Sequence, residues 1–168
     1  MSLFDIANVL SQYAGASATN PPPNVQQDFE KVSQNAPASH LAEGLAQAFH
    51  SNQTPAFGQM IASLFSQSNP EQRAGILSHL LPAAGPGLAS GIGGELASLL
   101  KGGASQVTPE QAAQVSPESV QQLAEQAKQN NPSIVDQASS FYAQHPKLVQ
   151  ALGAGALALV MSHISQRR

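Results

Sequence analysis

The sequence predicts an all-α protein, a compact bundle of about eight to ten short helices around an apolar C-terminal helix. Three observations predict this fold class. Apolar residues recur three and four positions apart, which is typical of amphipathic helices. No segment alternates apolar and polar residues, so we expect essentially no β-strand. A side chain that can cap a helix stands directly before proline at Thr54-Pro55, Asn69-Pro70, Thr108-Pro109, Ser116-Pro117 and Asn131-Pro132.

In the first half of the chain, apolar stripes and caps set the expected helices. Leu3, Ile6, Ala7 and Leu10 share one face of the first helix. Ser39 stands at the start of another helix, and its position favours an N-cap. Further on, Phe57, Met60, Ile61, Leu64 and Phe65 form a full apolar face, and Asn69 with Gln72 has the spacing of a capping box. The helices expected here cover residues 2–15, 24–35, 39–50, 55–67 and 70–82.

The second half shows the same signals. Thr108 with Gln111 has the spacing of a second capping box. Val120, Leu123, Ala124 and Ala127 repeat the apolar stripe, and Ile134, Val135, Ala138, Phe141 and Tyr142 form a wider one. The helices expected here cover residues 87–101, 109–114, 117–130, 132–144 and 146–164.

Two stretches rich in proline or glycine divide the chain. Pro21–Pro23 predict an extended segment over 18–24, and 82–103 is rich in glycine. We therefore expect an N-terminal amphipathic helix with a Pro-rich linker (1–23), an N-terminal helical unit (24–101) and a C-terminal helical unit packed with it (102–168). The sequence leaves open whether 82–103 is a hinge or a packed turn.

The last predicted helix is apolar nearly all round, which is typical of a helix buried by its neighbours. Its unbroken apolar run, Ala151 to Met161, has 11 residues, whereas a membrane span needs about 20. We therefore expect no transmembrane span, and, with no signal peptide recognised, a cytoplasmic protein. Small residues four apart predict close helix packing at Ala151, Ala154, Gly155 and Ala158. An interfacial or oligomer-forming helix is the alternative.

The sequence offers no motif for catalysis, metal or cofactor binding. The absence of cysteine excludes disulfides, thiolate metal sites and cysteine nucleophiles. No two histidines are spaced to share a helix face, and the three Ser-His dipeptides do not place their side chains together. The glycine-rich stretch lacks the Lys-Ser/Thr of a phosphate-binding loop. The seven Lys and Arg are scattered and the net charge is −3, which excludes a nucleic-acid footprint. We expect a protein that is not an enzyme.

Self-association or scaffolding is the leading functional hypothesis. Only 10% of the residues are charged, so repulsion between copies is weak. The amphipathic N-terminal segment could dock onto a neighbouring copy, and its candidate contacts are Leu3, Phe4, Ile6, Leu10 and Tyr13. The alternative is a carrier or binder of a lipid or apolar ligand, at a membrane surface or between helices. The sequence leaves open whether this segment packs on its own chain or on another.

Three short pieces of the chain carry a family resemblance. Met1-Ser2-Leu3-Phe4-Asp5, Leu80-Leu81-Pro82 and Val107-Thr108-Pro109-Glu110-Gln111 resemble the YidB-like family of small bacterial helical proteins. The Leu-Leu-Pro piece precedes the capped segment here, which departs from the order expected of that family. The resemblance implies a bacterial, all-helical protein and supplies no catalytic residues.

Overall fold

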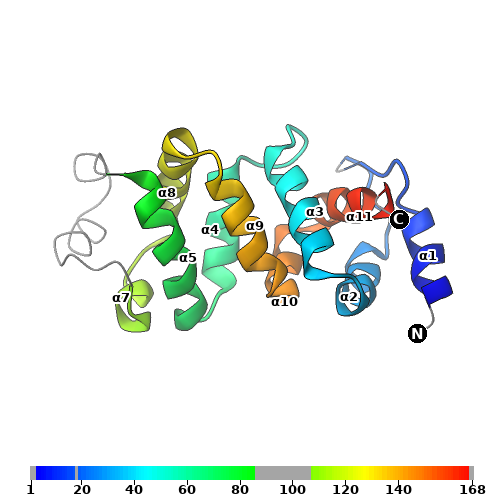
Figure 1. Ribbon diagram of the computed structural model, residues 1–168, viewed down its shortest axis with the longest axis horizontal. Helices are drawn as coiled ribbons and strands as arrows, with labels where there is room; N and C mark the ends of the chain where they lie inside the picture. The colour runs from blue at the N-terminus through cyan, green and yellow to red at the C-terminus, as the bar shows by residue number, and fades with distance from the viewer. Residues whose placement is uncertain (1–2, 18, 86–106, 167–168) are drawn as a thin grey trace. The chain divides into compact units, whose positions relative to one another are not determined.

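The computed structural model describes residues 3–17, 19–85 and 107–166 (Figure 1). Within these ranges the fold is all-α, and the β interaction found there is an isolated bridge between Ser17 and Asn20. The predicted fold class is therefore confirmed. The elements are α1 (Leu3–Ser11), α2 (Val25–Asn35), α3 (Ala38–His50), α4 (Phe57–Gln67), α5 (Pro70–Ala84), α7 (Pro109–Ala113), α8 (Pro117–Asn130), α9 (Ile134–Ala143), α10 (Pro146–Val149), the 3₁₀ helix η2 (Gln150–Leu152) and α11 (Ala154–Gln166).

The helices form two compact units. Unit 1 comprises Met1–Pro55 and Ser139–Arg168, and unit 2 comprises Ala56–Ala138, so that one boundary falls within α9. This division differs from the expected one at residues 23 and 101. Proline and glycine mark where the chain turns, but contacts between helices far apart in sequence decide which helices belong together. The expected helix 87–101 and most of the glycine-rich stretch lie outside the described residues.

Unit 2 is built on α8, which packs against α4 and α5, while α7 packs against α5. Two of these helices approach closely at Gly58 of α4, where a Cβ atom would stand 2.6 Å from the Gln121 carbonyl oxygen and 2.7 Å from Glu125 Cγ of α8. The Gly58 N–H donates to Glu125 Oε1 at 2.8 Å. Glu125 therefore supplies an acceptor to a backbone donor in the first turn of α4, which has no partner inside its own helix.

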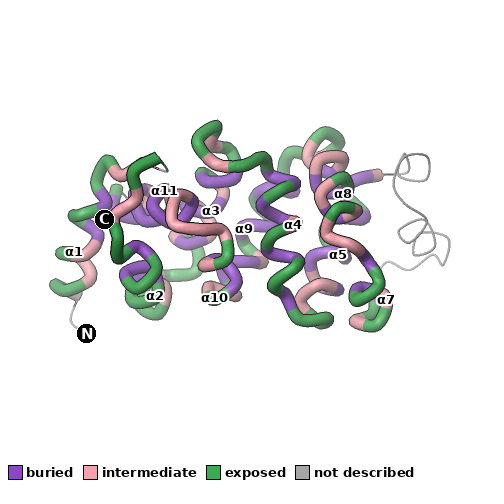
Figure 2. Tube along the Cα trace, turned by 180° about the vertical axis from the view of Figure 1, so that it is seen from behind, coloured by how far each residue is buried: buried purple, intermediate pink, exposed green. Residues whose placement is uncertain are grey.

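Unit 1 is built around α11, which contacts α1, α2 and α3. Most of the residues of α11 between Ala156 and Ser165 are buried. Gly44 lets α3 approach α11, because a Cβ there would lie 2.9 Å from Val160 Cγ1. In both units, buried residues lie along the helix sides that face neighbouring helices (Figure 2). The expected central role of the C-terminal helix is confirmed within unit 1.

The predicted final helix over 146–164 is wrong as one continuous element. Residues 146–149 form α10, 150–152 form η2, and α11 begins only after Gly153. Gly153 has φ of 91°, a conformation that residues with a side chain rarely adopt. The apolar run hides this break, because hydropathy does not distinguish a glycine inside a helix from one that ends it.

Three of the five predicted proline-linked caps are confirmed. Asn69 and Thr108 form reciprocal capping boxes with Gln72 and Gln111, and the Ser116 hydroxyl accepts from the Ser119 N–H. The other two side chains bond elsewhere. The Thr54 hydroxyl donates to the Ala48 carbonyl at the end of α3. Asn131 caps the end of α8 and accepts a hydrogen bond from the Ser133 hydroxyl. The predicted Ser39 cap is also wrong, because α3 begins at Ala38 after Pro37.

Candidate functional site

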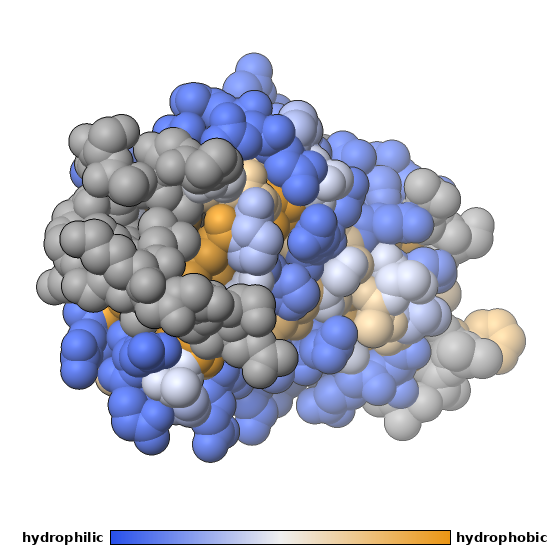
Figure 3. Space-filling view, turned by 60° about the vertical axis from the view of Figure 1, so that its left-hand side comes forward, coloured by the Kyte–Doolittle hydropathy of each residue, from blue (hydrophilic) through white to orange (hydrophobic). Residues whose placement is uncertain are grey.

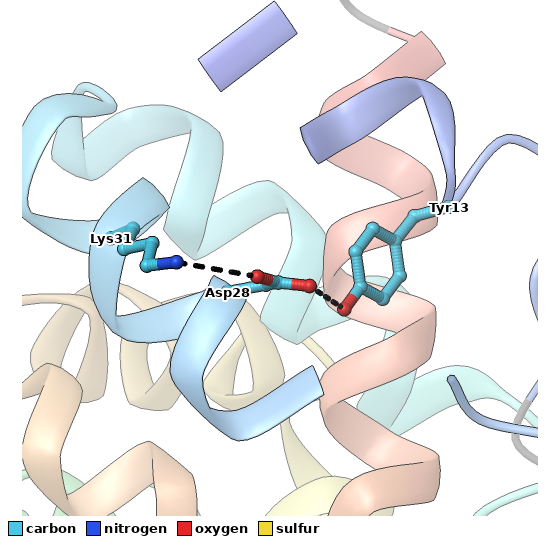
Figure 4. A network of polar contacts seen from close by, with 3 residues as sticks. All are labelled: Tyr13, Asp28 and Lys31. Atoms are coloured by element: carbon cyan, nitrogen blue, oxygen red, sulfur yellow. Dashed lines mark hydrogen bonds and ion pairs between the residues drawn. The ribbon is translucent and has the colours of Figure 1, made fainter. Parts of the chain in front are cut away.

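The segment that follows α1 is fastened to its own chain by a buried polar contact (Figure 4). The Tyr13 hydroxyl donates to Asp28 Oδ2 of α2 at 2.7 Å, and both residues are buried. Lys31 Nζ lies 3.9 Å from the other carboxylate oxygen, Oδ1. Burial raises the pKa of the Tyr13 phenol, and the hydrogen bond to Asp28 and the charge of that carboxylate raise it further. The contact therefore holds the end of the N-terminal segment on unit 1.

The five candidate contact residues of the N-terminal segment do not share one environment. Leu10 and Tyr13 are buried, where α1 contacts α2 and α11. Ile6 is half-buried, and the structure does not describe the Leu3 side chain. Phe4 is 86% exposed. Among the described residues, no other large hydrophobic side chain is exposed. In this structure the segment thus packs on its own chain and presents Phe4 to the outside.

The four small residues predicted to allow close packing are only partly used in this way. Ala158 is fully buried in α11. Ala154 and Gly155 are half-buried, and Ala151 is exposed in η2, before the break at Gly153. A close approach between α3 and α11 instead involves Gly44 of α3 and Val160. The spacing of small residues in the sequence correctly indicated α11 as a closely packed helix. It did not indicate Gly44 of α3, the small residue that lets the two helices approach.

A pocket of about 300 Å³ lies between the carboxyl-terminal ends of α3 and α11 in unit 1. We call it the α3–α11 pocket. Its lining is mostly polar, with two imidazoles, two primary amides, two hydroxyls and one apolar side chain. The lining residues are Gln47, His50, Ser51, Leu159, Ser162, His163 and Gln166.

The two histidines of the pocket differ in their surroundings. His50 is exposed, whereas the His163 side chain is only 19% exposed. His163 Nε2 has no hydrogen-bond partner among the described residues and lies 3.8 Å from Glu43 Oε2 of α3. That distance is too long for a hydrogen bond but close enough for an ion pair if the imidazole is protonated. The packing of α3 on α11 therefore places an imidazole nitrogen and a carboxylate side by side, and Glu43 is not among the residues that line the pocket.

Sequence reasoning missed this pocket. It considered histidines within one helix turn of each other, while the two segments that form the pocket, 47–51 and 159–166, are more than one hundred residues apart. Ser162 and His163 do line one pocket, but through their place in unit 1, and no hydrogen bond joins their side chains. Nothing in the sequence pairs these two helix ends before the packing of α3 on α11 is known.

Two further findings bear on function. In the part of the chain that the structure describes, no three or more His, Asp or Glu side chains come together as a metal site would need. Within the same residues, none of the helices has the length and apolar character required to cross a membrane.

Comparisons with known proteins find no counterpart for the chain. No protein-family model matches it, and neither the curated proteins nor the solved structures yield a match.

Proposed function

We propose that the protein acts by associating with further copies of itself through α1, as a non-enzymatic scaffold. The observation that carries this proposal is Phe4, which stands 86% exposed on a helix whose other end is fixed. Exposed aromatic side chains at the centre of an interface contribute much of the binding free energy. The bacterial and cytoplasmic setting expected from the sequence belongs to this proposal.

The anchoring of α1 supports its use as a contact surface. Leu10 and Tyr13 are buried within unit 1, and Tyr13 is bonded to Asp28, so α1 is held in place before a partner arrives. A surface that is already ordered loses little conformational entropy on binding. The half-buried Ala7 lies one turn from Phe4 and adds apolar area beside it on the same helix.

The low charge of the chain favours a second copy as the partner. A two-fold symmetric contact would bring two α1 helices together and bury Phe4 of both copies. Asp5 is the acidic residue of α1, and the net charge of the chain is −3, so like-charge repulsion between copies is small. Among the coloured residues in Figure 3 hydrophilic ones predominate, and hydrophobic atoms show in small areas between them.

The alternative of a lipid or apolar ligand has less support. The α3–α11 pocket is lined mainly by polar side chains, and Leu159 is its one apolar lining residue. Pockets for apolar ligands are lined predominantly by hydrophobic and aromatic side chains. We therefore do not assign this pocket to such a ligand, and vesicle binding serves as a contrary outcome in the test.

The test compares solution mass across protein concentrations by light scattering. Burying one phenylalanine contributes about 1.5–3 kcal/mol, so replacing Phe4 in both copies should weaken association by about 100-fold or more. We expect the wild-type mass to rise above 17.4 kDa with concentration and Phe4→Ser to remain monomeric. Gln59→Ser, an exposed change in α4, is the matched control. A wild-type protein that stays monomeric, or that binds phosphatidylcholine vesicles through Phe4 without self-association, contradicts the proposal.

A further inference from the structure

An imidazole and a carboxylate meet beside the crossing of α3 and α11. The two helices come close where Gly44 of α3 lies against Val160 of α11 (Figure 1). Glu43 precedes this glycine, and His163 follows Val160 by about one helical turn. His163 Nε2 and Glu43 Oε2 are both buried and lie 3.8 Å apart, so they face each other between the helices.

The buried nitrogen of His163 has hydrogen-bonding capacity that the helices do not use. Nε2 forms no hydrogen bond among the described residues, whereas buried polar atoms are nearly always bonded. A neutral imidazole carries one N–H, while a protonated one carries two and a positive charge. Protonation would therefore aim a charged donor at Glu43. A small rotation of the flexible glutamate side chain would then bring its oxygen within hydrogen-bond distance.

Glu43 is the counter-charge that a protonated His163 would meet. Among the described residues, His163 lies within ion-pair distance of Glu43 alone. His50 shares the α3–α11 pocket with His163 and would repel it when both are charged, but His50 is exposed and water weakens this repulsion. The other titratable groups on the α helices packed against α11 are His40 of α3, Asp28, Glu30 and Lys31 of α2, and Asp5 of α1.

We propose that His163 takes up a proton within folded unit 1, with Glu43 as its counter-ion, and that this proton fastens α3 to α11. Imidazoles ordinarily change charge between about pH 5 and 8, so the contact would respond to mild acidification. The attraction of Glu43 offsets the cost of charging an imidazole that is only 19% exposed. Neither residue belongs to α1, so the proposal stands apart from self-association.

The test compares the wild type with Glu43→Gln by urea unfolding at about pH 8 and about pH 5.5, on either side of the ordinary imidazole pKa. Glutamine keeps the size of the side chain and removes its charge. A glutamate is ordinarily ionised at both pH values, so the comparison reports the charge of the imidazole. The factor by which Glu43→Gln raises the unfolding equilibrium constant should be about two- to five-fold larger at the acidic pH.

Matched variants identify the partner of Glu43. Glu30→Gln removes the same charge from an exposed position of α2 and should show no such dependence on pH. The effect of Glu43→Gln should disappear in a His163→Gln background and persist in a His50→Gln background. Circular dichroism at both pH values checks that each variant is folded, and the comparison of wild type with Glu43→Gln does not require His163→Gln to fold. A factor that is the same at both pH values, an equal change with Glu30→Gln, or an effect that persists without His163 would overturn the proposal.

Discussion

At the scale of single residues, the two tyrosines of the chain show how one side chain can depend on its partner. Both are fully buried in unit 1. The Tyr13 hydroxyl donates to Asp28, whereas the Tyr142 hydroxyl has no hydrogen-bond partner among the described residues. The Tyr13–Asp28 hydrogen bond stabilises the fold, because a buried carboxylate that loses its donor is left with an uncompensated desolvation cost. A hydroxyl without a partner contributes no such hydrogen-bond stabilisation.

The two Tyr→Phe substitutions should therefore have different effects on stability. Tyr13→Phe removes the donor from Asp28 and should lower the free energy of unfolding by about 1–3 kcal/mol. Tyr142→Phe removes a buried hydroxyl that has no partner there, and should leave this free energy unchanged or raise it. Urea unfolding followed by circular dichroism measures both values. Equal losses in the two variants would contradict the assigned role of the Tyr13–Asp28 contact.

At the scale of elements, α4 and α8 illustrate a helix pair whose approach depends on one glycine. Gly58 is buried, and its N–H bonds to Glu125 of α8. Atoms of Gln121 and Glu125 lie too close to the position that a Cβ of residue 58 would take. The nearest is the Gln121 backbone carbonyl oxygen, which cannot move as a side chain can. The helices α4 and α8 must therefore separate before a larger residue fits at this position.

Gly58→Ala is thus expected to destabilise unit 2, although alanine is the better helix former. In an exposed helix this change would stabilise by about 1 kcal/mol, but overpacking here should cost about 1–3 kcal/mol. The sign of the change in the free energy of unfolding is therefore diagnostic. A stabilised Gly58→Ala variant in urea unfolding would mean that α4 and α8 do not approach this closely.

The elements were largely predictable because their signals are local. Asn69, Thr108 and Ser116 each precede proline and cap the helix that follows, as their sequence context indicates. Thr54 has the same context but bonds back to the end of α3, because the preceding carbonyls lie within its reach. Gly153 ends η2 with a positive φ, which an apolar run of small residues does not reveal.

At the scale of the whole molecule, little was predictable. Unit 1 joins the N-terminal segment to residues from 139 onward, and this pairing arises from contacts such as that of Gly44 with Val160. The α3–α11 pocket results from the same pairing. Amphipathic patterns state which face of each helix is buried, but not which helix covers it. The fold class therefore followed from the sequence, while the division into units and the pocket did not.

Alkaline pH should destabilise unit 1, because it holds both tyrosines. Burial raises the pKa of each phenol above its ordinary value in the folded state. Below the unfolded-state pKa of about 10 both phenols are protonated in both states, so their titration does not change the free energy of unfolding. This free energy falls as the pH rises above that value, since the unfolded chain then releases protons that the folded chain retains. Phenolate absorbance should rise only together with a loss of helical circular dichroism. Phenolate formation in a fully folded chain would contradict this linkage.

The most direct test of self-association through α1 is a distance measured between copies. The chain has no cysteine, so Asn8→Cys places a single spin label on the exposed side of α1, one turn from Phe4. Pulsed electron paramagnetic resonance should give a short, defined distance between copies, which is lost when Phe4→Ser is added or when unlabelled chain is in excess. A label at Gln59→Cys in α4 controls for random contacts. No defined distance at residue 8, or one that persists with Phe4→Ser, would contradict the account.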